Sequence, residues 1–221
     1  MNRVHFIISL IVTCVIFTSC TSGYVVRTWK NENAFPGNYN KILIIAIVNP
    51  ADSALRRTVE TNFKNSFQSA GYTALCSFEE FGASLRDLDQ EETYKSLCEK
   101  GIDAIFIAAI TDRGTGSKLD YRSLTDPVKY YYDQVWFFKE HQNKLPGFTG
   151  SPGPVASWEM ILFDLPTLQP HYIARTPISQ HIIEKSFDQQ FWDCMVRKLH
   201  KDRFLKRRRP LTVDNPSLKA F

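Results

Sequence analysis

Asp112 and Arg113 are the polar residues of this sequence that are best placed to bind a small ligand. They directly follow Ile102–Ile110, an apolar run that predicts a buried strand. Ligands of open α/β sheets bind beyond the carboxyl ends of the strands. If the strand predicted over Lys41–Val48 is a parallel neighbour, Asn49 lies at the same edge of the sheet. We therefore expect a groove near Asn49, Asp112 and Arg113, with a structural turn and a local ion pair as the alternative.

The sequence contains no compact catalytic motif. Gly114 and Gly116 do not extend into a phosphate-binding loop, and the patterns GxSxG and HExxH are absent. Glu159 and Asp164 are five residues apart on one predicted strand, so alternation places these carboxylates on opposite faces. The histidines after the first twenty residues lack the spacing of metal ligands: His141, His171, His181 and His200. We expect a non-enzymatic protein without a metal or a cofactor.

Aromatic side chains are concentrated in the irregular segment 111–153, where eight of them fall within the 28 residues from 121 to 148. Aromatic side chains supply large contact areas and are common at interfaces. The segment therefore predicts a surface for a partner or ligand, centred on Tyr130, Tyr131, Tyr132 and Trp136. The alternative is that it forms further strands that pack on the sheet.

The amino terminus has the pattern of an export signal. Arg3 precedes the mainly apolar run Phe6–Phe17. Twelve helical residues span roughly 18 Å, which is shorter than the ~30 Å hydrocarbon core of a bilayer. A secretory signal peptide therefore fits better than a membrane span. The small residues Thr18 and Ser19 lead directly to Cys20.

This ending resembles the lipobox of bacterial lipoproteins, particularly those of Bacteroidota, although Phe17 stands where leucine is usual. The resemblance implies cleavage before Cys20 and attachment of acyl chains such as palmitate, which would hold the protein on a membrane. No acidic residue closely follows Cys20, which in such families implies the periplasm-facing side of the outer membrane. The alternatives are an ordinary signal peptide cut near Ser19 or an uncleaved anchor.

A strongly basic stretch lies near the carboxyl terminus. Residues 197–209 contain eight basic residues and one acidic residue, whereas the whole chain has a net charge of only +4. We expect Lys206, Arg207, Arg208 and Arg209 to contact anionic lipid headgroups, an acidic wall polymer or an acidic partner. The alternative is a solvated helix end that complements its own dipole. Nucleic acid is not expected as a partner of an exported protein.

The composition is that of a globular protein, with 43% hydrophobic and 23% charged residues among 221. It excludes a disordered, collagen-like or multi-span membrane chain. We expect a signal peptide over 1–19, a lipidated tether over 20–40, a single α/β domain over 41–205 and a basic tail over 206–221. The cysteines that follow the tether lie among apolar residues, and we expect buried, unreactive thiols: Cys76, Cys98 and Cys194.

The first half of the domain reads as alternating strands and helices. A helix follows the strand over 41–48, because Asn49 and Pro50 suit a helix start and an apolar stripe repeats every four residues up to Gly71. That stripe consists of Leu55, Val59, Phe63 and Phe67. A strand over 72–78, a helix over 89–100 and the strand over 102–110 follow. The second helix is expected to direct Tyr94, Leu97 and Cys98 inward. The order predicts parallel pairing.

The second half predicts an antiparallel hairpin and a closing helix. Val155–Asp164 and His171–Thr176 flank a turn that contains two prolines. The last helix opens at Thr176 and Pro177, with an apolar stripe of Ile183, Phe187, Phe191, Met195 and Leu199. A possible first strand lies near Tyr24–Trp29. The prediction is therefore an α/β sandwich of two or three layers with a mixed sheet.

The segments KILIIAIVNP, GIDAIFIAAITD and FDLPTLQPHYIART resemble envelope lipoproteins with a TolB amino-terminal, CsgG or LpoB-like domain. In that type, the hairpin has an aspartate, an aromatic and a small residue, here Asp164, Tyr172 and Ala174. The likeness covers residues 41–110 and 155–205 and implies a fold and an envelope location, without an activity. We expect a lipid-anchored binding or scaffold protein. The alternatives are a periplasmic enzyme or small-ligand binder, and a ring-forming or secretion-associated subunit.

Overall fold

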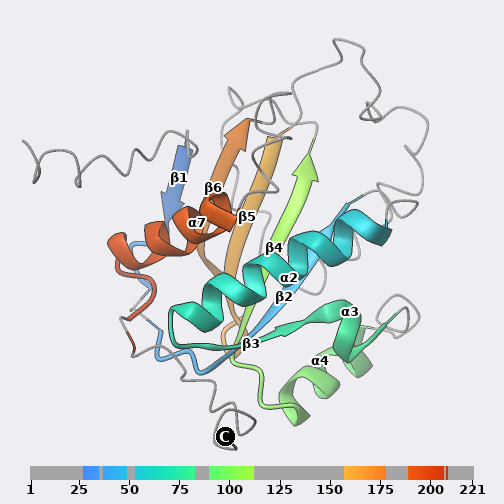
Figure 1. Ribbon diagram of the computed structural model, residues 1–221. Helices are drawn as coiled ribbons and strands as arrows, with labels where there is room; N and C mark the ends of the chain where they lie inside the picture. The colour runs from blue at the N-terminus through green and yellow to red at the C-terminus, as the bar shows by residue number, and fades with distance from the viewer. Residues whose placement is uncertain are drawn as a thin grey trace, which may run out of the picture.

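One mixed sheet forms the centre of the molecule (Figure 1). The computed structural model describes residues 27–34, 37–48, 53–82, 90–111, 157–177, 189–206 and 208. Within them the strands are β1 (Arg27–Lys30), β2 (Lys41–Ile47), β3 (Thr73–Cys76), β4 (Ala104–Thr111), β5 (Ser157–Asp164) and β6 (Gln169–Pro177). Their order across the sheet is β1-β6-β5-β4-β2-β3. The β2 strand pairs in parallel with β3 and β4, and the remaining pairs are antiparallel.

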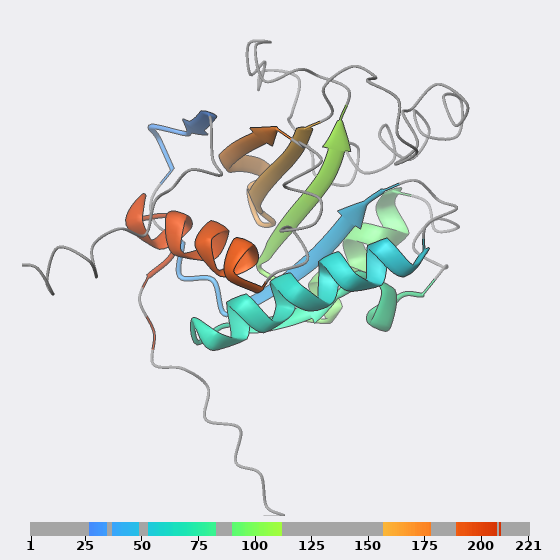
Figure 2. The same ribbon diagram turned by 45° about the horizontal axis from the view of Figure 1, so that its top comes forward.

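Helices cover both faces of this sheet (Figure 2). The described helices are α2 (Ser53–Ser69), α3 (Ser77–Glu80), α4 (Gln90–Glu99) and α7 (Gln189–Lys201). The α2 and α7 helices pack on the face that contains Ile44 and Phe106, whereas Leu97 of α4 packs on the face that contains Leu43 and Ile105. The protein is therefore an α/β sandwich with three layers and a mixed sheet, which confirms the predicted fold class.

The first strand–helix pair follows the predicted pattern. Residues 42–47 of β2 and the following Val48 are all buried, because helices cover both faces of the strand. The α2 stripe Leu55, Val59, Phe63 and Phe67 is buried as predicted. The ring centroids of Phe63 and Phe106 lie 4.7 Å apart in an edge-on arrangement that favours aromatic attraction. Asn49 and Pro50, which were predicted to start this helix, lie outside the described residues.

Two details of the middle segment differ from the prediction. The β3 strand ends at Cys76 and Phe78 belongs to the short helix α3, so the strand predicted over 72–78 is shorter. In α4, Leu97 is buried and Tyr94 is half-buried, but Cys98 is exposed. Successive residues of a helix are rotated by about 100°, and α4 is oriented so that this rotation carries Cys98 from the buried side of Leu97 to the solvent.

The β5–β6 hairpin joins the sheet beside β4, as predicted. Asp164 fixes its turn, since Oδ2 accepts hydrogen bonds from the Thr167 backbone nitrogen at 3.1 Å and hydroxyl at 2.6 Å. The β1 strand pairs with β6 at the edge of the sheet, with Arg27 opposite Arg175. In α7, Phe191, Met195 and Leu199 are buried as predicted, and the other two residues of the predicted stripe lie outside the described residues. Thr176 and Pro177, which were predicted to open this helix, belong to β6 instead.

Candidate functional site

The carboxyl ends of β2 and β4 lie side by side at the upper edge of the sheet in Figure 1. They are parallel neighbours, with Ile47 opposite Ala109. From β2 the chain continues to β3 on one side and then returns to β4 on the other, so this edge is a topological switch point. The predicted groove requires this arrangement. Its three side chains, Asn49, Asp112 and Arg113, lie outside the described residues.

The aromatic segment is attached at the same edge. Thr111, the last residue of β4, is the register partner of Ser157, the first residue of β5. The chain therefore leaves and re-enters the sheet at adjacent positions, with residues 112–156 between them. Tyr130, Tyr131, Tyr132 and Trp136 belong to that stretch and lie outside the described residues, as do Cys20, Arg207 and Arg209.

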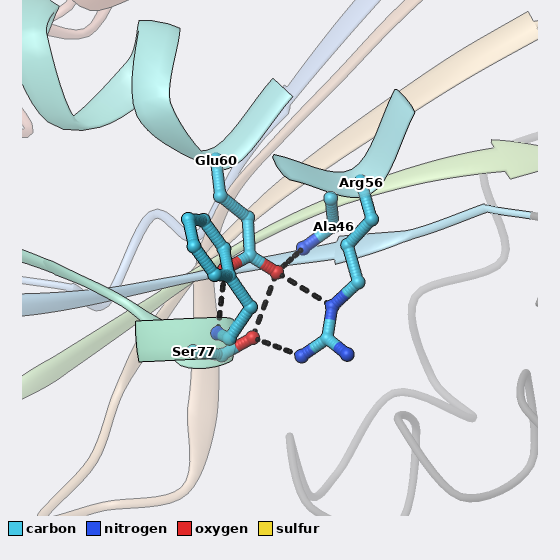
Figure 3. Close-up of polar contacts among 5 residues, drawn as sticks. Ala46, Arg56, Glu60 and Ser77 are labelled. Atoms are coloured by element: carbon cyan, nitrogen blue, oxygen red, sulfur yellow. Dashed lines mark hydrogen bonds and ion pairs between the residues drawn. The ribbon is translucent and has the colours of Figure 1, made fainter. Parts of the chain in front are cut away.

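A fully buried carboxylate lies next to this edge (Figure 3). Glu60 of α2 accepts hydrogen bonds at Oε1 from the backbone nitrogen of Ala46 at 3.1 Å, from Arg56 Nε at 3.0 Å and from the Ser77 hydroxyl at 2.7 Å. Its Oε2 accepts the backbone N–H of Phe78 at 2.9 Å. Arg56 also donates from Nη2 to the Ser77 hydroxyl at 2.8 Å. Both oxygens of the carboxylate are therefore engaged.

The position of Glu60 follows from the shortness of β3. The register of β2 with β3 ends at Ile44 and Cys76, so Ala46 lies beyond the part of β2 that pairs with β3, although it still pairs with β4. The carboxylate of Glu60 supplies an acceptor for its N–H, which would otherwise be buried without one. Glu60 thus joins α2, β2 and the start of α3 and serves as a structural carboxylate. Sequence reasoning missed it, although an Arg–Glu pair at i,i+4 within an apolar stripe is a usable signal.

A second buried ion pair lies on β5 and β6. Glu159 and Arg175 are register partners, and Arg175 Nη2 lies 2.5 Å from Glu159 Oε2. Arg175 Nε also donates to the same oxygen at 3.1 Å, and both side chains are almost completely buried. Sequence reasoning compared Glu159 only with Asp164 and did not find Arg175. Period-two alternation alone cannot identify a cross-strand partner, because the register depends on the turn.

Tyr39 and His171 form a buried polar pair at the opposite edge of the sheet. The Tyr39 hydroxyl lies 2.5 Å from His171 Nδ1. Burial raises the pKa of the Tyr39 phenol, and the nearby carboxylates of Asp164 and Asp103 raise it further. Burial also lowers the pKa of His171, against a smaller opposing effect of Asp164. A protonated phenol and a neutral imidazole therefore share this hydrogen bond.

The end of α7 is fastened to the sheet through Asp202. Its carboxylate lies 2.9 Å from Lys30 Nζ and 2.7 Å from Lys198 Nζ, and it accepts the Tyr172 hydroxyl at 2.9 Å. Burial alone raises the pKa of Asp202, but the hydrogen bonds from Lys198, Lys30 and Tyr172 outweigh it, so that the pKa lies below its usual value.

The beginning of the predicted basic tail is also attached to the domain. The Tyr72 hydroxyl donates to the backbone carbonyl of Lys206 at 2.5 Å, and the Lys206 ammonium group contacts Asn38 Oδ1. The guanidinium of Arg208 lies 4.9 Å from the centroid of the Tyr72 ring. Two of the four predicted tail contacts, Lys206 and Arg208, are thus held at fixed positions beside the sheet.

The cysteines differ in exposure. Cys76 and Cys194 are buried, whereas Cys98 is exposed, so the prediction that all three are buried is wrong for Cys98. Burial raises the pKa of the Cys76 thiol to about 12, and Glu79 and Glu60 add to this effect. Among the described residues, no group of three or more histidine, cysteine, aspartate or glutamate side chains could hold a metal ion. None of the described helices is both long and apolar enough to cross a membrane.

Comparisons with known proteins add no named family. No protein-family model matches the chain, and no curated protein matches it. Two solved structures of dodecameric PelC from Paraburkholderia phytofirmans show some similarity. The structure of a singly substituted variant of PelC has a TM-score of 0.39 and 9% sequence identity. The match covers 76% of this chain and 94% of the PelC chain. Another crystal form gives 0.36 at 10% identity, over 69% and 78% of the respective chains. Similarity at this level supports no statement about activity or assembly.

Proposed function

We propose that the chain is a lipid-anchored protein of the bacterial cell envelope that acts as a non-enzymatic binding or scaffold module. The anchoring part of the proposal is supported by Thr18, Ser19 and Cys20 at the end of a short apolar segment that follows Arg3. Acyl chains on Cys20 would hold the domain at the membrane, and we assign it to the periplasmic side of the outer membrane.

The binding role depends on one observation, the attachment of the aromatic segment. Its ends, Thr111 and Ser157, are register partners at the carboxyl edge of the sheet. This edge is where α/β sheets bind their ligands, and the intervening residues contain eight aromatic side chains between 121 and 148. Aromatic side chains on a fixed frame suit the contact surface of a partner protein.

The buried carboxylate of Glu60 supports a structural rather than a catalytic role for this residue. Glu60 accepts hydrogen bonds from two backbone amides, from Arg56 and from Ser77. Catalytic carboxylates need an acceptor position that is open to substrate, whereas both oxygens of Glu60 are occupied.

Palmitate labelling tests the anchor. Cells that express the wild-type chain are grown with labelled palmitate, and the protein is expected to take up the label and to lose the first nineteen residues. The Cys20→Ala variant is expected to take up none and to retain the precursor length, whereas Cys98→Ala is expected to be labelled like the wild type. A wild-type chain without label would show that the lipoprotein assignment is wrong.

Affinity capture from solubilised membranes tests the partner surface. Replacing Tyr130, Tyr131, Tyr132 and Trp136 by serine is expected to reduce the captured partner without lowering the melting temperature. A Tyr94→Ser variant, with the change on α4, is the matched control and is expected to capture as much as the wild type. A large fall in melting temperature in the four-site variant would instead show that these side chains belong to the core.

The second candidate function is a periplasmic small-ligand binder or enzyme that uses the groove near Asn49, Asp112 and Arg113. The observation in its favour is the topological switch point between β2 and β4. A thermal-shift screen with small metabolites would then find a ligand that stabilises the wild type. That stabilisation should be absent in the Asp112→Asn and Arg113→Gln variants, whose partner capture should remain unchanged.

A further inference from the structure

The helices α2, α4 and α7 end in the same main-chain motif, but one of them ends with an unusual residue. In each helix a residue with positive φ follows the last turn. These residues are Gly71 after α2, Gly101 after α4 and Arg203 after α7, with φ of 88°, 65° and 66°. Glycine adopts this left-handed conformation without strain, whereas a side chain with a Cβ atom makes it unfavourable.

The hydrogen bonds show that the three helix ends are equivalent. In each, the left-handed residue donates its N–H to the carbonyl three residues earlier, and the next residue donates to the carbonyl five residues earlier. The first bond measures 2.9 Å at Gly71, 2.9 Å at Gly101 and 3.1 Å at Arg203. The second bond measures 3.0, 3.1 and 3.0 Å in the same order. Arg203 therefore occupies a position for which this chain elsewhere uses glycine, and its side chain is exposed to solvent.

The exposed charged side chains near Arg203 are positive, apart from Glu32, which lies two residues after Lys30. Lys201 and Lys206 are also exposed, and Lys30 of β1 is 44% exposed. The carboxylate within this stretch, Asp202, is only 8% exposed and is already paired with Lys30 and Lys198. Solvent therefore meets a surface of cations, which we name the α7 corner: Lys30, Lys201, Arg203 and Lys206.

We propose that the α7 corner binds the anionic phospholipid headgroups of the membrane that holds the lipid anchor. Arg203 adds an exposed guanidinium to this surface at a helix end where α2 and α4 have glycine. The inference rests on the proposed function for the presence of the membrane. Each basic residue near an anionic bilayer contributes to binding, and the fixed position of this corner allows several to act together.

The reach of the chain agrees with this placement. Arg27 lies seven positions after Cys20, which is at most about 24 Å of extended chain. Arg27 and Lys30 are the ends of β1, about 10 Å apart. The tether is therefore long enough for the α7 corner to touch the bilayer. Arg27, where the tether joins β1, lies toward the same end of the strands as Thr111 and Ser157, whereas Lys30 lies toward the other end, so the tether must run back along β1 for the α7 corner to touch the bilayer.

Vesicle co-sedimentation tests this proposal. The full chain carrying Cys20→Ala, which has no acyl group, is mixed with vesicles of phosphatidylcholine and with vesicles of equal parts phosphatidylcholine and phosphatidylglycerol. The apolar amino-terminal segment contributes to both measurements, so the ratio of the two partition coefficients isolates the effect of headgroup charge. The added pair Lys201→Gln and Arg203→Gln is expected to lower this ratio by about tenfold or more. The control pair Arg57→Gln and Lys95→Gln, on α2 and α4, is expected to change it by less than about twofold.

Arg203→Gly provides a second variant that keeps the helix end intact, since glycine suits the left-handed position. It is expected to lower the vesicle ratio without lowering the melting temperature. Equal losses for the two charge pairs, or no preference of the parent chain for anionic vesicles, would overturn the proposal. A vesicle ratio of one, together with binding to dextran sulfate that depends on the α7 corner, would also overturn it. That result would assign the surface to an acidic polymer. The vesicle assay uses no acyl chain, so it does not depend on the palmitate result. If palmitate labelling fails, the lipid anchor is contradicted, whereas the measured preference for anionic headgroups is not.

Discussion

Glu60 Oε2 and the backbone nitrogen of Phe78 lie 2.9 Å apart, so a side chain from the middle of α2 caps the first turn of α3. Cys76, the residue at the capping position of α3 itself, makes no side-chain hydrogen bond of this kind. A carboxylate at the amino end of a helix is favoured by the exposed N–H groups and the positive end of the dipole. The short helix therefore depends on a residue 18 positions earlier in the chain.

Removing this carboxylate should destabilise the whole domain. Glu60→Ala leaves the amides of Ala46 and Phe78 without their acceptor and Arg56 without its anion, so we expect a loss of about 3–5 kcal/mol in the free energy of unfolding. Urea titration followed by circular dichroism measures this. Glu91→Ala, an exposed change on α4, is the control and should stay within about 0.5 kcal/mol. A Glu60→Ala variant as stable as this control would contradict the structural role.

The Glu159–Arg175 pair should behave non-additively. Arg175→Met alone leaves a buried carboxylate without its cation and is expected to lose about 3–5 kcal/mol of stability. The double variant Glu159→Leu with Arg175→Met removes both charges and should recover most of that loss. A double-mutant cycle with Glu159→Leu as the other single change measures the coupling. Additive losses would mean that the two side chains do not stabilise the fold as a pair.

His171 should make the stability depend on pH. Its pKa in the folded protein is lowered by burial, so below about pH 6.5 the unfolded chain binds a proton that the folded chain does not. The contribution of His171 to stability is therefore complete above about pH 6.5 and decreases as the pH falls toward the folded pKa. Thermal melts between about pH 7.5 and pH 5.5 should show a smaller fall for His171→Gln than for the wild type. Parallel curves would refute this dependence.

The left-handed residues at the helix ends give opposite expectations for two substitutions. Arg203→Gly relieves an unfavourable conformation and should stabilise the fold by about 1 kcal/mol. Gly101→Ala should destabilise it by about the same amount, although a Cβ atom at Gly101 would meet no atom within 4 Å. The second change thus isolates the backbone effect from steric conflict. Both are measured by chemical denaturation, and changes of the same sign would be inconsistent with equivalent helix ends.

The thiols should react in the order of their exposure. Cys98 is exposed and is expected to react with iodoacetamide in the native protein. Cys76 and Cys194 are buried, and the raised pKa of Cys76 keeps it a thiol, so both should react only after denaturation. Peptide mass spectrometry distinguishes the sites. Rapid native labelling of Cys76 would show that the end of β3 opens readily.

The regular elements could be predicted because each has a strong local signal. The apolar run of β2 and the four-residue stripe of α2 determine their own structure, and Gly71 marks where α2 ends. The end of β3 could not be read in this way, because it depends on hydrogen bonds that the Ser77 hydroxyl and the Phe78 backbone N–H donate to Glu60. Cys98 faces solvent because of how α4 is rotated about its own axis relative to the sheet. The sequence pattern around Leu97 does not determine that rotation.

The buried polar residues were less accessible to sequence reasoning than the apolar core. Glu159 and Arg175 become partners only through the β5–β6 register, which includes a shift between Leu162 and Phe163. His171 is separated from Tyr39 by 132 residues. Such pairs depend on tertiary placement, whereas a strand or helix signal lies within a few neighbouring residues. The predicted groove was deduced from topology, and β2 and β4 do have the parallel arrangement that it needs.

Thr111 and Ser157 face each other across one pair of strands, so the 45 residues between them form the connection of a simple β-hairpin. Partnered residues in antiparallel strands have Cα atoms only about 5 Å apart, a gap that a two-residue turn can close. Evolution can therefore lengthen, shorten or exchange this connection without changing the register of β4 and β5. The length and sequence of residues 112–156 can thus change while the sheet to which they are joined stays the same.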